Sequence, residues 1–429
     1  MRTFIKKSLV IFAVGLGFGT FAQNRDLDNY RQPDQRGLNV FESPKDTAST
    51  FENVKVRIGG SFALQYQALD HENANGAPDL MSLTNNFNLA TANLDLDVAL
   101  AKGVRMHLRT YLSSRHHNET YVKGGYLQVD NLDFIKEGFA ADLMKHVTIK
   151  VGHMEINYGD AHFRRTDNAQ ALYNPFVGNY IMDSFTTEVG GEVYYRNNGF
   201  LAMLGATNTK LNQNVVDDNA KGNPSPSIVA KLGFDKQIND DLRVRLTGSL
   251  YNTAWASRTY LYAGDRAGAR YYLVMAPPMT GTSATTATSA FTTGRYNPGF
   301  NNKLTAIMFN PFLKYKGLEF FGMLELVNGR NYGETDRRKA TQLGSELLYR
   351  FGQNERFYLG GRFNKVSAEE ATGEDIDITR FNLGGGWFLT KNILAKVEYV
   401  NQKYDGFATA SIYDGGKFNG FVAEAIISF

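Results

Sequence analysis

A regular alternation of apolar and polar side chains runs through most of the chain from residue 54 onward. In the segment 242–250, leucine and valine occupy most of the alternate positions, while arginine, threonine and serine lie between them. Because successive side chains of a β-strand point to opposite faces, such a segment predicts a strand with one apolar and one polar face. The alternation therefore predicts an all-β protein.

Sixteen segments of about 9–14 residues show this alternation. Every second connection between them is short, such as Lys102-Gly103 or Lys316-Gly317, and most of the others are longer. Short periplasmic turns alternating with long extracellular loops are typical of a transmembrane antiparallel β-barrel. We predict strands near 54–67, 89–100, 104–115, 119–131, 147–158, 187–197, 200–210, 225–238, 242–254, 302–316, 318–331, 339–351, 356–368, 378–390, 393–405 and 418–429.

The length of these segments favours a barrel in a membrane over a soluble sheet protein. A tilted strand needs about 9–11 residues to cross a bilayer, whereas strands of soluble sandwiches are about 5–6 residues long. A propeller would show a repeat from blade to blade, and we find none. We expect a barrel of about sixteen strands over 54–429, with eighteen as the alternative count, and a helical turn within 132–146.

The N-terminal 53 residues do not continue the strand pattern. Residues 1–22 join a short basic stretch, an apolar run and a small residue at Ala22, which is the layout of a secretory signal peptide. A membrane anchor is the alternative, but the apolar run is too short to cross about 30 Å of hydrocarbon. Residues 23–53 are polar and aperiodic, and we expect a flexible periplasmic lead-in, too charged and thin to plug a barrel.

Charge and cysteine content narrow the possible partners and cofactors. The formal charge is +3, and the leader holds three of the basic residues, so the rest of the chain is neutral and gives no reason to expect nucleic-acid binding. The chain has no cysteine, which excludes disulfides and zinc-thiolate sites. We expect neither a metal nor a cofactor: His116-His117 lies at an outer turn, and Gly384–Gly386 precedes no helix that could hold phosphate.

The predicted strand faces place many charged side chains inside the barrel. So many ionised groups cannot be kept dry, and sixteen strands leave room for an aqueous channel. The alternative for any one of these residues is an ion pair along the wall. The expected lumen-wall residues include Arg57, Arg105, Lys231, Arg243, Arg245, Arg380, Glu192, Glu325 and Glu346.

The loop 159–186 is unusually apolar for a segment surrounded by water. The alternatives for covering it are the outer rim, a neighbouring subunit and the barrel interior. The longest loop follows strand nine, and in it we expect a small hairpin from Arg258 to Met275 and an exposed run at 280–293.

The last strand, 418–429, alternates apolar residues and ends in Phe429. This ending resembles the assembly signal of Gram-negative outer-membrane proteins, which implies delivery to the outer membrane by the barrel assembly machinery. With its leader, strand rhythm and charged interior, the chain resembles the general porins and, more loosely, the phosphate-selective porin O and P family. The glutamine after Ala22 and the strands rich in Tyr, Asn and Gly resemble proteins of Bacteroidota.

The resemblance to porins implies an aqueous channel for passive diffusion of small hydrophilic solutes or ions. It also implies that loop 159–186 folds inward and narrows the lumen, and that the protein contacts lipopolysaccharide and forms a homotrimer. The alternative function is an anion-selective or phosphate-selective channel; a barrel enzyme and a transporter of hydrophobic compounds fit less well. The expected constriction residues are Asp160, His162, Arg164, Arg165, Asp167, Arg109 and Arg362.

Overall fold

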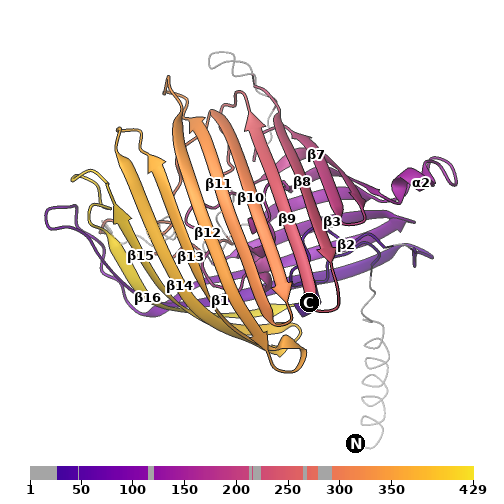
Figure 1. Cartoon of the computed structure of the whole chain (residues 1–429), viewed down its shortest axis with the longest axis horizontal. Helices are drawn as coiled ribbons and strands as arrows, with labels where there is room; N and C mark the ends of the chain where they lie inside the picture. Colours follow the sequence, from indigo (N-terminus) through magenta and orange to yellow (C-terminus); the bar gives the residue numbers. More distant parts are fainter. Residues whose placement is uncertain are drawn as a thin grey trace, which may run out of the picture.

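Sixteen antiparallel strands form one closed barrel (Figure 1). The computed structural model describes residues 27–46, 48–114, 120–211, 215, 224–263, 268–278 and 292–429. The strands are β1 (Lys55–Glu72), β2 (Asn86–Ala101), β3 (Val104–Ser113), β4 (Tyr121–Val129), β5 (Val147–Glu155), β6 (Thr187–Asn197), β7 (Phe200–Thr207), β8 (Ser227–Gln237), β9 (Leu242–Thr253), β10 (Lys303–Tyr315), β11 (Leu318–Arg330), β12 (Arg338–Phe351), β13 (Phe357–Glu369), β14 (Asp375–Thr390), β15 (Ile393–Asp405) and β16 (Lys417–Ser428).

The predicted fold and strand order are confirmed. All sixteen expected segments form strands, each pairs with its neighbours in the sequence, and β1 pairs with β16 from Ser61↔Ser428 to Glu72↔Lys417. The ladder continues to Phe429, whose backbone exchanges two hydrogen bonds with Gly60 (2.9 and 3.0 Å). Closure leaves no strand edge unpaired, which a barrel in lipid requires.

The two faces of each strand differ as the alternation predicts. In β9, Leu246 lies exposed on the outside, while its neighbours Arg245 and Thr247 are buried on the inside. An outer surface rich in leucine, phenylalanine and valine suits hydrocarbon, which offers no partner to polar groups. Among the described residues, no helix is long and apolar enough to cross a membrane.

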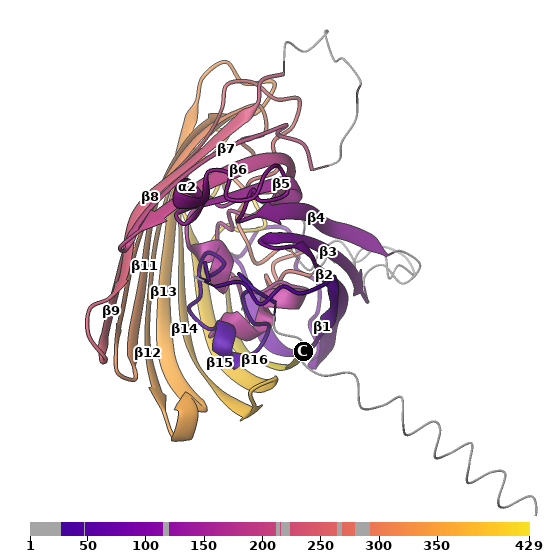
Figure 2. The same cartoon turned by 90° about the vertical axis from the view of Figure 1, so that its right-hand side faces the viewer.

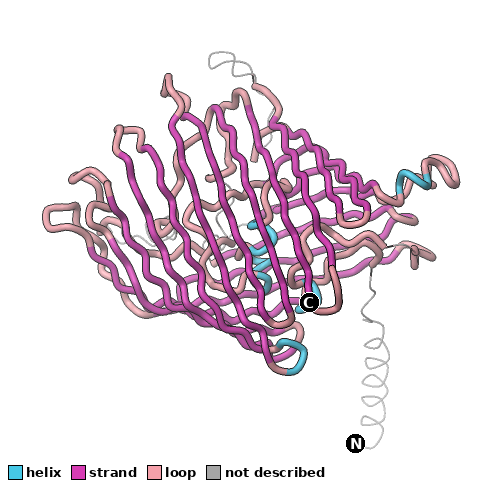
Figure 3. Tube along the Cα trace, in the orientation of Figure 1, coloured by secondary structure: helices cyan, strands magenta, loops and turns pink. Residues whose placement is uncertain are grey.

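Short connections gather at one end of the barrel, called here the turn end, and most long ones at the other, the loop end (Figure 3). Asn198-Gly199 joins β6 to β7 with both residues at positive φ, which suits the twist of a two-residue hairpin. One turn-end connection is longer: it joins β4 to β5 and contains the helix α2 (Ala141–Met144), as expected for 132–146. Three short 3-10 segments belong to the N-terminal and long-loop segments, and one to a turn: η1 (Gln35–Gly37), η2 (Ala161–Arg164), η3 (Asn168–Tyr173) and η4 (Gln353–Glu355).

The N-terminal segment lies inside the barrel, so the expectation of a flexible, non-plugging lead-in is wrong for the described part of 23–53. Phe41 is buried between the rings of Phe163 and Phe312 (5.8 and 5.3 Å between centroids). The segment is charged because its partners inside the barrel are charged: Glu42, for example, pairs with Arg245 of β9 at 2.8 Å. Local composition alone did not reveal these distant partners.

Two further segments lie within the barrel, 156–186 and the described part of 254–302 (Figure 2). The hairpin expected from Arg258 to Met275 is wrong, because none of its described residues forms a strand. Instead, aromatic residues such as Tyr262 and Tyr272 are buried in one cluster with the loop residues Tyr158 and Tyr180. Most of the expected exposed run 280–293 lies outside the described residues.

Candidate functional site: the barrel interior

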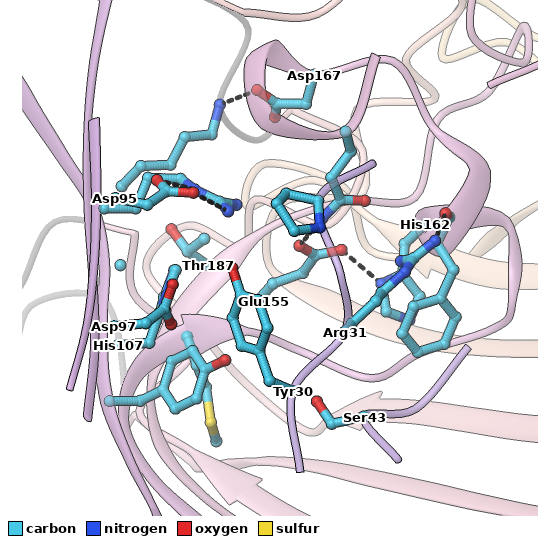
Figure 4. A pocket seen from close by; sticks show the side chains of 18 of the residues that line it. Tyr30, Arg31, Ser43, Asp95, Asp97, His107, Glu155, His162, Asp167 and Thr187 are labelled. Carbon is cyan, nitrogen blue, oxygen red and sulfur yellow. Dashed lines mark hydrogen bonds and ion pairs between the residues drawn. The ribbon is translucent and has the colours of Figure 1, made fainter. Parts of the chain in front are cut away.

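A polar cavity of about 170 Å³ remains between the inserted segments and the wall formed by β1–β6 (Figure 4). Tyr30, Arg31 and Ser43 of the N-terminal segment lie on one side of it. Glu155, His162 and Asp167 line it from the end of β5 and the loop that follows. The inserted segments thus fill much of the interior on this side, and two further pockets, of about 690 and 450 Å³, open at the turn end.

Charges of both signs line the cavity in equal number. The five carboxylates are Glu42, Asp95, Asp97, Glu155 and Asp167, and the five permanent cations are Arg31, Arg105, Arg109, Lys123 and Lys150. Most of these ten side chains form ion pairs. For example, Arg109 donates two hydrogen bonds to Asp95 at 2.8 Å, and Arg105 lies 3.2 Å from Asp97. Balanced, paired charge gives the cavity little net potential for either ion sign.

Aromatic rings hold the cationic side chains of the N-terminal segment and the nearby wall. The Arg31 guanidinium lies 3.8 Å from the centre of the Tyr173 ring, and Tyr30 lies beside Arg57 and Arg105 (5.1 and 5.4 Å). Arg31 also donates hydrogen bonds to the carbonyls of Gly37 and Phe163. These contacts join the N-terminal segment to the loop 156–186 across the interior.

Asp160 fixes the start of the loop to the wall. Its carboxylate accepts two hydrogen bonds from Arg245 (both 2.8 Å), one from Lys231 (3.0 Å) and one from Thr247 (2.7 Å). Burial would raise the pKa of this carboxyl, but Arg245 and Lys231 outweigh burial and hold the pKa below its usual value. Asp160 therefore stays ionised in an otherwise closed part of the interior.

Arg164 and Arg362 meet at a shared carboxylate. Glu346 of β12 lies 2.8 Å from Arg164 of the loop and 2.8 Å from Arg362 of β13, and it accepts a hydrogen bond from Tyr180. Arg164 also pairs with Glu319 at 2.8 Å. Both arginines are buried, and they also donate hydrogen bonds to the side-chain oxygens of Asn39 and Asn174 and to the carbonyl of Gly178.

The remaining predicted loop residues form a second group next to the cavity. Asp167 pairs with Lys123 at 2.5 Å and with Arg165 at 2.7 Å. Arg165 also donates to Asp183 at 2.7 Å and lies 3.8 Å from the centre of the Phe185 ring. His162 bonds to Glu155 and Asn157, at 2.5 and 3.0 Å.

The predicted constriction residues thus separate into two sets. Arg109, His162 and Asp167 line the cavity, whereas Asp160, Arg164, Arg165 and Arg362 lie buried in ion pairs and are not part of its lining. Sequence reasoning missed two groups of cavity residues. One is Lys123, whose place on an inner strand face offered a signal, and the other consists of Tyr30, Arg31 and Glu42 in the segment expected to be flexible. Asp97 and His107 were expected on the inner faces, though not at the constriction.

Most of the predicted lumen-wall residues are buried, and many bond to other wall groups or to the inserted segments. Glu325 accepts hydrogen bonds from Tyr158 and Tyr262, one from each inserted loop (3.1 and 2.8 Å). Arg380 donates to the backbone carbonyls of Asn179 and Gly294. The buried members of the set are Arg105, Lys231, Arg245, Arg380, Glu192, Glu325 and Glu346, while Arg57 and Arg243 are partly exposed. Several of them, including Arg245 and Glu346, form ion pairs, which was the alternative to facing open water in the lumen.

Within the part of the chain that the structure describes, no group of three or more His, Asp or Glu side chains could hold a metal ion. His116 and His117 lie outside the described residues.

The barrel is similar to solved outer-membrane barrels. An anion-selective porin from Comamonas acidovorans matches with 11% identity and a TM-score of 0.53, covering 88% of this chain and 100% of that one. The outer-membrane channel DcaP of Acinetobacter baumannii matches with 11% identity and a TM-score of 0.51 (88% and 98% covered). A loop-deletion mutant of the outer-membrane protein OmpT of Vibrio cholerae matches with 13% identity and a TM-score of 0.51 (88% and 100%). No family model and no curated protein matches the chain.

At these identities, the similarity concerns the fold alone. The resemblance to the phosphate-selective porin O and P family, inferred from the sequence, stays a prediction.

Proposed function

We propose that the protein is an outer-membrane channel for passive diffusion of small hydrophilic solutes. The observation that carries this proposal is a closed sixteen-strand barrel with an apolar outside and a polar cavity inside. Such a barrel is wider than its wall side chains can fill, so the width left to solutes depends on what else occupies it. With its turns in the periplasm, the barrel would open between that compartment and the cell exterior.

The proposed path follows the wall of β1–β6, where the cavity lies. Two inserted elements narrow it: the loop 156–186, held at Asp160 and Arg164, and the N-terminal segment, held at Phe41 and Glu42. The described part of 254–302 fills more of the interior: Arg270 pairs with Glu424 of β16 at 2.8 Å, and Tyr262 donates a hydrogen bond to Glu325 of β11. The channel is therefore narrow and admits small solutes best.

A liposome-swelling assay tests the proposal. Folded protein in liposomes should admit small sugars and amino acids and exclude oligosaccharides, because the inserted segments leave a narrow path. Liposomes that contain the folded barrel and swell no faster than empty ones would overturn it.

We expect weak ion selectivity, which charge variants at one ion pair can shift in opposite directions. Asp95→Asn removes a negative charge from the cavity and should move the reversal potential in a salt gradient towards anion selectivity. Arg109→Gln removes its partner and should move it towards cation selectivity. Planar-bilayer recordings measure both variants. If the reversal potential shifts in the same direction in both variants, or in neither, the ions do not pass through this cavity.

We also propose that Phe429 acts in assembly and not in the channel. Its backbone closes the β16–β1 ladder, while its side chain lies exposed on the outer surface. Phe429→Ser keeps the backbone bonds, so the folded barrel should keep its stability while the amount assembled in cells falls several-fold. Heat-modifiable mobility of outer-membrane fractions measures this amount. Refolding yield in detergent is the control and should not change.

A catalytic role has less support, so we propose that the protein is not an enzyme. His162 is held by Glu155 and Asn157, and Asp160 is held by two cations, so neither is placed as a base next to a nucleophile. A homotrimer and contacts to lipopolysaccharide remain proposals, carried by the porin resemblance.

A further inference from the structure

The connection between β4 and β5 differs from the other turn-end connections. It spans 130–146, contains α2, and projects beyond the strand ends (Figure 1). Gly138 and Ala140 adopt positive φ and turn the chain back towards the barrel. Unlike the loop 156–186, this connection contributes no residue to the lining of the interior cavity.

The strand register shows which face of the barrel the connection covers. Gln128 of β4 lies opposite Arg105 of β3, and the two side chains bond inside the barrel at 2.9 Å. The next residue, Val129, therefore faces outward. Val129 lies opposite Ile149 of β5, so Ile149 and, two positions away, Val147 also face outward.

These outward residues are covered, unlike their neighbours. Val129 and Val147 are 8% and 9% exposed, whereas the outward-facing Val151 and Val193 are 54% and 49% exposed. The cover is Met144 of α2, which packs with Val129 and Val147 in one apolar cluster. The connection therefore folds back onto the outer wall at the turn end.

The connection also presents four apolar side chains that are about half exposed. Phe134, Ile135, Phe139 and Leu143 are 47–61% exposed, about as much as the outward-facing strand residues. Two of the charges beside them are paired, since Lys102 lies 3.1 Å from Asp133 and Lys145 lies 2.6 Å from Asp142, while Lys136 and Glu137 lie exposed. Such a surface fits a boundary between hydrocarbon and polar headgroups.

We propose that residues 132–144 form an interfacial anchor whose four exposed apolar side chains lie among the lipids of the leaflet at the turn end. Lipid is the occupant because the anchor rests on the outer wall and continues the apolar band that faces the membrane. The anchor fixes the depth of this side of the barrel, where β4, β5 and β7 are among the shortest strands. The proposal depends on the barrel lying in a bilayer and not on whether it conducts.

Depth-dependent fluorescence quenching tests this placement. The chain has two tryptophans, Trp255 and Trp387, and both are first replaced by phenylalanine. Phe139→Trp and, separately, Leu143→Trp then report on the anchor in liposomes made with brominated phosphatidylcholine. Bromines near the headgroup end of the acyl chain should quench strongly, and bromines near the chain terminus weakly. Asp240→Trp, in the β8–β9 turn, is the control and should not be quenched.

Two results would overturn the proposal. One is a probe at 139 and 143 that is no more quenched than the control. The other is a change of oligomeric state, which would show that a second copy of the chain covers these side chains. Analytical ultracentrifugation would then find an oligomer for the parent and a monomer for the combined variant Phe134→Ser, Ile135→Ser, Phe139→Ser and Leu143→Ser. The lipid anchor predicts that this variant keeps the oligomeric state of the parent, because the covering cluster around Met144 is intact.

Discussion

Excision of residues 27–46 should raise the single-channel conductance several-fold. This segment crosses the turn end of the barrel: Gln35 bonds to the turn residue Lys391, Asn39 to Glu319 of β11, and Lys45 to Asp130 after β4. Because it occupies the cross-section through which solutes must pass, its loss opens the lumen beside the cavity. Planar-bilayer recording of the folded variant measures the change.

A peptide with the sequence of residues 27–46 provides the matched control. Added to the turn side of the excised channel, it should reduce the conductance again, while a scrambled peptide of the same composition should not. A folded, excised barrel with the conductance of the parent protein would show that the segment does not limit the path. Heat-modifiable mobility separates that outcome from failure to fold.

Asp160→Ala should release the loop 156–186 and destabilise the protein. The substitution leaves Lys231 and Arg245 buried with Glu42 as their nearest remaining carboxylate, at 3.6 and 2.8 Å. Removing one partner from a buried charge pair costs about 3–5 kcal/mol. We therefore expect a lower midpoint of thermal unfolding. We also expect a larger and more variable conductance, because a released loop no longer keeps the channel at a constant width. Differential scanning calorimetry and single-channel recording measure the two effects.

Asp377→Ala is the control for this substitution. Asp377 pairs with Lys365 at 2.9 Å, but both side chains are more than 40% exposed. An exposed ion pair contributes about 0–1 kcal/mol, so the control should leave stability and conductance almost unchanged. Equal effects of the two substitutions would contradict the anchoring role of Asp160.

The wall of the barrel was predictable because its signal is local. Each strand alternates with period two, and Phe429 and the hairpin turns set the phase, so the sequence indicated which side chains face inward. Register was only partly accessible: the turn Lys102-Gly103 alone predicts Asp97 opposite Leu108, but a register shift between Ala99 and Ala101 places Asp97 opposite His107.

The segments of the chain that fold into the barrel could not be predicted from a local pattern. The N-terminal segment was expected to be flexible because it is charged, yet Glu42 pairs with Arg245, some 200 residues later in the chain. A hairpin was expected from Arg258 to Met275, but Tyr262 and Tyr272 bond to Glu325 and Glu398 inside the barrel. Partners so distant in sequence leave no local pattern, so the placement of these segments required the structure.

The central claim is that a narrow aqueous path remains through a barrel partly filled by its own chain. Single-channel recording of the folded, full-length mature protein in a planar bilayer tests this claim most directly. We predict discrete conductance steps of low amplitude, with a reversal potential close to zero in a salt gradient. Membranes that contain the folded barrel and show no steps at any applied voltage would contradict it.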